Sequence, residues 1–175
     1  MILPIYAYGY SVLKKVAKPI EKDHENFDEL LKNMWDTMYN ANGVGLAGPQ
    51  VGKSIRIFLD ELKKGIKKVF INAEILEETG DSWAYEEGCL SIPQIRGDVE
   101  RQKKIKIKYL DENFEEYVEE YEGINARVIQ HEYDHIEGKL FTEKLKPLKK
   151  KMIKRKLEKI KAGKVGTEYR MKFPG

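Results

Sequence analysis

The spacing of apolar residues predicts three helices along the chain. Over Asn26–Asn42 apolar residues recur every three or four positions, which is typical of an amphipathic helix with one face toward a core. A second helix is expected over about Gly123–Glu137, with Gly138 as its stop signal. A third is expected after Pro147, where a few apolar residues are spaced among many lysines.

Other segments have the pattern of short β-strands. The glycine-rich stretch Gly43–Gly52 cannot be regular over its whole length, so we expect a loop there, and Thr79–Ser82 is typical of a turn. Four runs are rich in β-branched or aromatic residues, or alternate between apolar and polar: Ile55–Leu59, Lys68–Ile71, Ile105–Tyr109 and Glu116–Tyr121. Together with the helices, these antiparallel strands predict an α+β fold.

Size and composition narrow the class of protein. A chain of 175 residues fits one domain over 1–175, and we see no internal repeat or linker that would divide it. A single cysteine excludes an intramolecular disulfide framework, and the first ten residues lack the features of a signal peptide. No apolar run reaches the roughly 18 residues that a membrane helix requires. We therefore expect a soluble, cytoplasmic protein that does not enter a membrane.

The strongest chemical signal is the run from His131 to His135. Two histidines four positions apart on a helix point the same way, so both imidazoles can bind one metal ion. Glu132 projects from the same turn at another angle, where a carboxylate can reach a water molecule on that metal. This arrangement is typical of metal-assisted hydrolysis.

A third metal ligand is not obvious from spacing alone. In one group of zinc proteases it would be a histidine at the position of Phe141. Glu143 and Glu158 are nearby carboxylates, but Glu158 stands among lysines and is more typical of a solvated helix face. Cys89 is the better candidate, since a thiolate is a strong, soft ligand and Gly88 allows another backbone to approach. A lone cysteine is usually only a small buried hydrophobe, so its neighbours decide the question.

Three motifs decide whether Cys89 is the third ligand, because together they occur in this order in one protein family. They are Gly43–Gln50, Glu87–Ser91 and Gln130–Gly138, and with them the chain resembles peptide deformylase. Departures from the family pattern are small. Gly48 stands where alanine is usual, which would loosen the loop, and Ile136 replaces a leucine of similar volume. Arg127 is expected to place a charge at the rim of the substrate side-chain pocket.

The resemblance implies strands packed around a central metal-binding helix, with an N-terminal helix and a basic C-terminal helix. It implies a metal held by Cys89, His131 and His135, with water in the fourth position. The ion implied is Fe2+, and Zn2+, Ni2+ or Co2+ can occupy the same site.

It also implies the reaction, which is removal of the formyl group from N-formylmethionyl peptides. Glu132 would take a proton from water and return it to the leaving amine. The side-chain amide of Gln50 and the backbone N–H of Leu90 would stabilise the developing oxyanion. The peptide backbone would pair with Gly45 and with the segment that ends in Gly88. The methionine side chain would enter an apolar pocket whose expected members are Val44, Tyr85, Glu87, Ile124, Val128 and His131.

Charge adds a further expectation. The net charge is +3, but Lys139–Lys164 alone carries +10 and Met1–Gly138 carries −8. A charge run of this kind is either a solvated helix face or a contact for an anionic partner, and for a deformylase that partner would be ribosomal RNA rather than DNA.

Two other classes of protein stay open at this point. One is a zinc endopeptidase that uses Glu158 as its third ligand. The other is an RNA-binding protein without catalytic activity, in which the metal is structural. A structural site would need four protein ligands, whereas only Cys89, His131 and His135 are plausible here.

Overall fold

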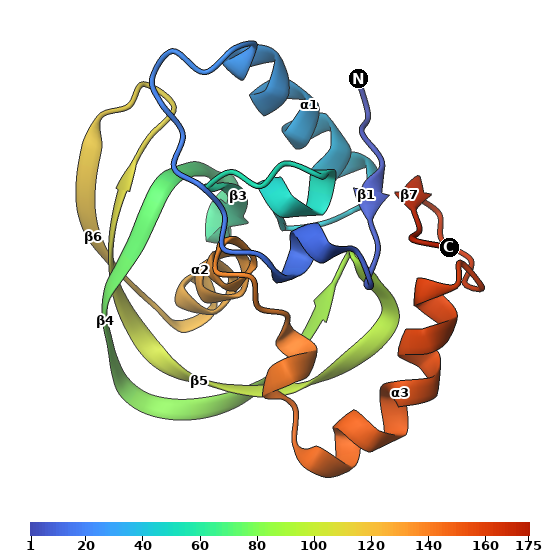
Figure 1. The fold of residues 1–175 in the computed structure, drawn as a ribbon. Helices are drawn as coiled ribbons and strands as arrows, with labels where there is room; N and C mark the ends of the chain where they lie inside the picture. The colour runs from blue at the N-terminus through green and yellow to red at the C-terminus, as the bar shows by residue number, and fades with distance from the viewer.

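Three α-helices and seven strands make up the computed structural model, which describes residues 1–175 (Figure 1). The helices are α1 (Phe27–Asn40), α2 (Gly123–Ile136) and α3 (Pro147–Lys161). The predicted boundaries of α1 and α2 are therefore correct to within two residues. Four short 3-10 turns lie between the larger elements: η1 (Ser11–Lys14), η2 (Gly48–Val51), η3 (Lys63–Gly65) and η4 (Phe141–Lys144).

Most of the strands form one antiparallel sheet, which confirms the predicted α+β class. Its strands lie in sequence order: β2 (Gly45–Ala47), β3 (Ile57–Leu62), β4 (Ile66–Cys89), β5 (Ile92–Leu110) and β6 (Glu116–Glu122). The two remaining strands, β1 (Ile5–Tyr6) and β7 (Met171–Lys172), pair in parallel and join the two ends of the chain.

The predicted turn at Thr79–Ser82 is wrong, because β4 continues through it. Thr79 pairs with Lys104 and Ser82 pairs with Gln102, so β4 has one more residue than β5 between these pairs. The extra residue forms a β-bulge, and Gly80 supplies the left-handed conformation there with a φ of 80°. Gly80 therefore marks a bend within a strand and not a turn between strands.

The true turn of this hairpin is at Leu90–Ser91. Cys89 ends β4 and pairs with Ile92, the first residue of β5, so only two residues connect two very long strands. The candidate metal ligand Cys89 consequently lies at the tip of the hairpin.

The sheet curves around α2, which lies inside the curve (Figure 1). Ala126, Ile129 and Ile136 of α2 are fully buried against Phe58 and Phe70 of the sheet. On the other side of β3, α1 buries an apolar stripe that contains Met34 and Met38. Burial of these stripes fixes the orientation of α2, and with it the direction in which its histidines point.

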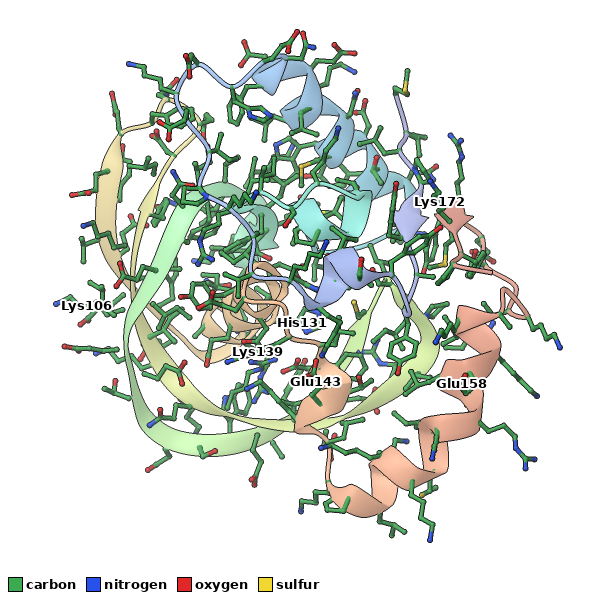
Figure 2. The ribbon with its side chains drawn as sticks, viewed as in Figure 1. Lys106, His131, Lys139, Glu143, Glu158 and Lys172 are labelled. Carbon is green, nitrogen blue, oxygen red and sulfur yellow. The ribbon has the colours of Figure 1, made fainter.

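α3 packs on the molecule through few residues. Ile153 and Ile160 are buried against Phe141 and Val99, while most of the lysines of α3 face away from the body (Figure 2). No helix in the structure combines the length and the apolar character that crossing a membrane requires.

Candidate active site and metal centre

A cleft of about 990 Å³ lies between β2, the tip of the β4–β5 hairpin and α2. Each residue that the sequence placed in the substrate or catalytic set lines it: Val44, Gly45, Gln50, Tyr85, Glu87, Gly88, Leu90, Ile124, Val128 and Glu132. Of the three expected metal ligands, Cys89 and His131 line the cleft, and His135 lies just beneath it, fully buried.

Cys89, His131 and His135 converge at one end of this cleft. One donor atom from each lies within 4.8 Å of the other two, and Cys89 Sγ is 3.4 Å from His135 Nε2. The hairpin tip supplies the thiol, and one face of α2 supplies both imidazoles, as the spacing of four predicts. A thiolate with two imidazoles is a donor set that suits a divalent transition metal and leaves a position open.

The carboxylates weighed as alternative third ligands lie elsewhere. Glu158 is exposed on α3, away from His131 (Figure 2). Glu143 is used at the start of η4, where its carboxylate accepts a hydrogen bond from the backbone N–H of Leu140 at 2.7 Å. The geometry therefore gives no support to the endopeptidase alternative.

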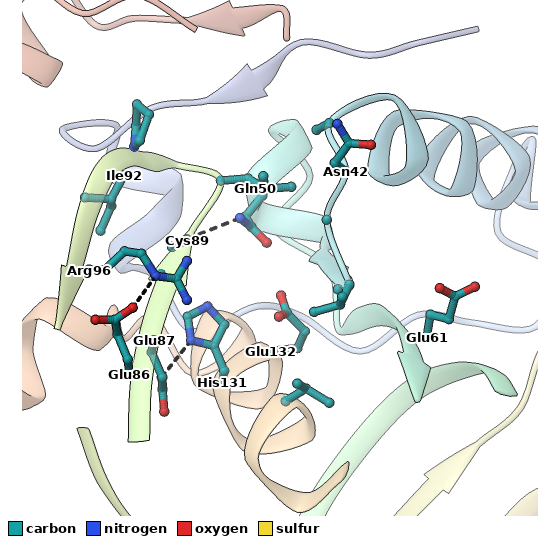
Figure 3. Close-up of a pocket in the computed structure, with 18 of the residues that line it drawn as sticks. Asn42, Gln50, Glu61, Glu86, Glu87, Cys89, Ile92, Arg96, His131 and Glu132 are labelled. Atoms are coloured by element: carbon teal, nitrogen blue, oxygen red, sulfur yellow. Dashed lines mark hydrogen bonds and ion pairs between the residues drawn. The ribbon is translucent and has the colours of Figure 1, made fainter. Parts of the chain in front are cut away.

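His131 is held by a buried ionic network centred on Glu87. Its Nδ1 lies 2.9 Å from Glu87 Oε1, which leaves Nε2 directed at the cleft (Figure 3). Arg101 donates two hydrogen bonds to the same carboxylate, at 2.7 and 3.0 Å. Burial alone would raise the pKa of Glu87, but hydrogen bonds from His131 and Arg101 outweigh it and hold the pKa well below its usual range. Glu87 therefore stays ionised and fixes the tautomer and orientation of His131.

His135 is held neutral by its surroundings. Burial, followed by repulsion from His131 and Arg101, lowers the pKa of His135 well below its usual value. A neutral imidazole is the form that binds a metal, so this site favours the ligating state at neutral pH.

Glu132 and Asp60 form a pair of buried carboxyl groups behind Gly45. Burial raises the pKa of Glu132 to about 7, and burial together with repulsion from Glu132 raises the pKa of Asp60 well above its usual value. Both oxygens of Asp60 lack a hydrogen-bond partner. A Cβ atom on Gly45 would lie 2.5 Å from Glu132 Oε2 and 2.6 Å from Asp60 Oδ1, so only glycine leaves room for both groups.

Gln50 is positioned by its own short helical turn. Its Oε1 accepts a hydrogen bond from the backbone N–H of Ala47 at 3.0 Å, which turns Nε2 toward the hairpin tip. There Nε2 lies 3.2 Å from Ser91 Oγ. It lies 3.5 Å from Cys89 Sγ (Figure 3). An amide donor is thus fixed in advance beside the convergent ligands.

Two expectations about single residues are not met. Arg127 is not a rim charge, because it is 2% exposed and donates to Glu87, to the carbonyl of Val99 and to the carbonyl of Trp83, each at 2.7 Å. Its charge belongs to the network beneath the pocket. Gly48 does not loosen its loop, since a Cβ there would lie only 2.8 Å from the carbonyl oxygen of Ile55.

Sequence reasoning missed the supporting groups Arg101 and Asp60. For Arg101 a signal existed, because odd-numbered residues of β5 such as Val99 face inward and Arg101 follows in the same alternation. An arginine at an inward position requires a buried acidic partner, which is Glu87. Asp60 lies in a buried strand, and nothing in its neighbourhood along the chain distinguishes it.

Comparisons with known proteins agree with the motifs. Residues 2–151 match the family described as polypeptide deformylase. A peptide deformylase of Christiangramia forsetii is 58% identical over 190 aligned positions, which cover 99% of this chain and 97% of the relative. One of Flavobacterium psychrophilum is 53% identical and covers 98% and 97%.

Solved structures are similar throughout the fold. A peptide deformylase of Legionella pneumophila superposes with a TM-score of 0.85 at 40% identity, covering 94% of this chain and 98% of that one. That of Thermotoga maritima has a TM-score of 0.80 at 44% identity and covers 84% and 99%. Peptide deformylases are metal-dependent hydrolases, and the convergence of Cys89, His131 and His135 is consistent with that chemistry. The chain belongs to the peptide deformylase family.

Proposed function

We propose that the cleft removes the formyl group of its substrates beside Cys89, His131 and His135, and that Glu132 moves the proton. Removal of the N-terminal formyl group from nascent peptides is the activity of the family to which this chain belongs. The observation that supports the assignment of residues is the burial of Glu132 next to three convergent metal-ligating side chains.

Cys89, His131 and His135 would hold the metal ion, and the residues around them suit that role. Glu87 orients His131, and burial keeps His135 neutral. A divalent ion at this position supplies Lewis acidity, which makes a water molecule acidic enough to react at neutral pH. We propose Fe2+ as the resident ion, and Zn2+, Ni2+ or Co2+ can replace it.

The proton steps belong to Glu132. Its carboxylate accepts a proton from the attacking water while the water oxygen adds to the formyl carbon. Glu132 then gives that proton to the leaving nitrogen, the bond between carbon and nitrogen breaks, and formate and a free amine are released. A pKa of about 7 suits both halves of this cycle, because the group is readily ionised and readily protonated near neutral pH.

Gln50 and Leu90 would stabilise the oxyanion that forms when water adds. Gln50 Nε2 is already oriented by Ala47, and Leu90 N–H lies in the tight turn that follows Cys89. Donors fixed in this way need no reorganisation during the reaction, and each can contribute about 3 kcal/mol.

The substrate would bind as an added strand across the cleft. Gly45 of β2 lies on one side, and Gly88 at the end of β4 lies on the other, so the peptide backbone could pair with both strands. The methionine side chain would enter the region lined by Val44, Ile124 and Val128. Tyr85, Glu87 and His131 complete the lining of this proposed pocket.

We also propose that α3 contacts ribosomal RNA in the cytoplasm, where nascent chains emerge. Lys150, Lys154 and Arg155 are exposed, and the buried Ile153 and Ile160 keep their side of the helix on the body. A positive helix on an otherwise acidic molecule is complementary to a phosphate backbone.

Glu132→Ala tests the proposed mechanism most directly. We expect kcat/KM for a formyl-Met peptide to fall by about 100-fold or more while the metal content stays unchanged. Glu158→Gln is the matched control, and its activity should equal that of the wild type. A Glu132→Ala variant with nearly full activity would overturn the assignment, and loss of metal in Glu158→Gln would favour the endopeptidase alternative.

Anaerobic purification followed by metal analysis tests the proposed ion and its ligand Cys89. We expect iron at about one equivalent per chain, and activity that is lost in air as the iron–thiolate centre oxidises. Cys89→Ser should lower the iron content. Iron-loaded enzyme that is stable in air, or unchanged iron in Cys89→Ser, would contradict these assignments.

A further inference from the structure

The last residues of the chain return to the active-site cleft. Gly166, Thr167, Glu168 and Tyr169 line the same cavity as the proposed catalytic residues, just before β7 pairs with β1. These four residues form one wall of the cleft. The family match ends at residue 151, so this wall lies outside the part of the chain that the match covers.

The wall is fastened to the molecule at both of its ends. Gln94 Nε2 donates to the carbonyl of Gly166 at 2.8 Å, and the backbone N–H of Ile5 donates to the carbonyl of Arg170 at 3.0 Å. Between these points, Thr167 Oγ1 donates to the carbonyl of Tyr169 at 2.7 Å, which closes a local turn. The segment therefore has a defined conformation beside the site.

Another contact of this wall reaches the hairpin tip. Tyr169 OH donates to the carbonyl of Leu90 at 2.7 Å, and the backbone N–H of Tyr8 donates to the carbonyl of Ser91 at 2.9 Å. Both carbonyls of the two-residue turn are thus held by groups from opposite ends of the chain. Burial raises the pKa of Tyr169 above its usual value, so its phenol stays protonated and able to donate.

We propose that Tyr169 is a positioning residue for deformylation and that Glu168, beside it, contacts the peptide residues that follow methionine. Tyr169 fixes the peptide plane after Leu90, which restricts rotation about the Leu90 backbone and so aims its N–H at the reacting oxygen. This proposal rests on the role given to Leu90 above.

The negative charge of Glu168 should favour peptides that carry a cationic side chain after methionine. Of the other carboxylates at the cleft rim, Glu86 is neutralised by Arg96 at 2.9 Å, and Glu61 accepts a hydrogen bond from the neutral phenol of Tyr39 at 2.9 Å. Glu168 is exposed and has no ion pair, so it can meet a cationic side chain of a bound peptide. At an exposed position the preference should be a few-fold and should weaken with salt.

Tyr169→Phe tests the positioning role, and Tyr10→Phe is its matched control. Both variants remove one hydrogen bond from a phenol to a backbone carbonyl, but only Tyr169 touches Leu90. In Tyr169→Phe we expect kcat to fall about threefold to tenfold with KM and metal content unchanged, and amide exchange at residues 89–92 to become faster. Tyr10→Phe should change neither kcat nor the rate of amide exchange at residues 89–92.

The exchange measurement needs no substrate, so it decides the structural role of Tyr169 even if the wild-type protein fails to deformylate a formyl-Met peptide. That failure would count against the proposed function and not against the contact. Equal exchange rates and equal kcat in Tyr169→Phe and Tyr10→Phe would overturn the positioning role.

Glu168→Gln tests the peptide contact. The wild type should have a kcat/KM a few-fold higher for formyl-Met peptides with lysine at the second or third residue than for those with glutamate, and the ratio should fall with added salt. Glu168→Gln should lower the ratio, whereas Glu158→Gln on α3 should not. A ratio that is the same in the wild type and in Glu168→Gln would overturn this part of the proposal.

Discussion

Two buried acids, Glu132 and Asp60, lie where a protein designed only for stability would place apolar side chains. Glu132 is 5% exposed and Asp60 is fully buried, and neither is neutralised by a directly bonded cation. Desolvation of such groups costs free energy whenever they ionise. The active site is therefore destabilised by the same burial that raises the pKa of Glu132 toward neutrality.

Glu132→Gln should stabilise the metal-free protein at high pH. Burial raises the pKa of Glu132 from 4.5 to about 7, so the unfolded chain loses this proton first and stability falls as pH rises between these values. At pH 8 we expect the variant to gain on the order of 3 kcal/mol in free energy of unfolding, and at pH 4 to gain nothing. Denaturant titrations of metal-free protein at the two pH values measure this.

Glu158→Gln, an exposed change on α3, provides the comparison and should leave both values unaltered. A Glu132→Gln variant that is no more stable than the wild type at pH 8 would show that burial does not perturb this carboxyl.

Gly45→Ala should impair catalysis more than folding. The backbone at Gly45 is ordinary extended strand, but the new methyl group would lie 2.5 Å from Glu132 Oε2 and must displace it. We expect kcat/KM to fall by about tenfold or more, since small displacements of a reacting group are costly. Steady-state kinetics together with thermal melts measure the two effects. A large drop in melting temperature with unchanged kcat/KM would contradict this reading of the contact.

What the sequence could predict at this scale depended on local spacing. His131 and His135 are neighbours on one helix, so the period of the helix alone places them together. Asp60 and Tyr169 reach the site from distant strands and from the tail, and no local pattern marks either residue. Their positions follow only from the path of the chain.

Among the elements, helices were easier to predict than strands. α1 and α2 have sharp apolar stripes and clear ends. The sequence of the long β4–β5 hairpin instead predicts several short strands, because Gly80, which forms a bulge within β4, has the pattern of a turn. The real turn, Leu90–Ser91, lacks the glycine or asparagine that usually marks a two-residue hairpin. Tertiary contacts from Tyr8, Gln50 and Tyr169 hold that turn instead.

Reversing charges on α3 tests its proposed contact with ribosomal RNA. Lys150→Glu combined with Lys154→Glu should reduce co-sedimentation with ribosomes, and binding of the wild type should fall steeply with rising salt. Lys22→Glu combined with Lys103→Glu makes the same charge change at exposed sites away from α3 and should have a much smaller effect. Equal binding by the two double variants, or binding that does not respond to salt, would leave α3 as an ordinary solvated helix.

For the whole molecule, the proposed metal would connect the hairpin tip to the central helix. Cys89 ends β4, and both histidines belong to α2, so one ion would join the sheet to the element that it surrounds. Because a ligand that binds only the folded state stabilises it, removal of the metal by a chelator should lower the melting temperature by about 5–10 °C. Calorimetry before and after reloading measures the shift.

In Cys89→Ser, removal of the metal by a chelator should lower the melting temperature by less, because the metal is already held more weakly between the hairpin tip and α2. An unchanged melting temperature in wild-type protein that metal analysis shows to be depleted would mean that the centre does not stabilise the fold.

The pairing of β1 with β7 also sets the order in which the cleft is completed during synthesis. Ribosomes make a chain from its N-terminus, so β1 and Tyr8 emerge long before Tyr169 and β7. The hairpin turn at Leu90–Ser91 is held by contacts from both Tyr8 and Tyr169, and it gains the second of them only after Tyr169 has been made. A nascent chain that has not reached Tyr169 therefore lacks one wall of its cleft, although Cys89, His131 and His135 have already been made.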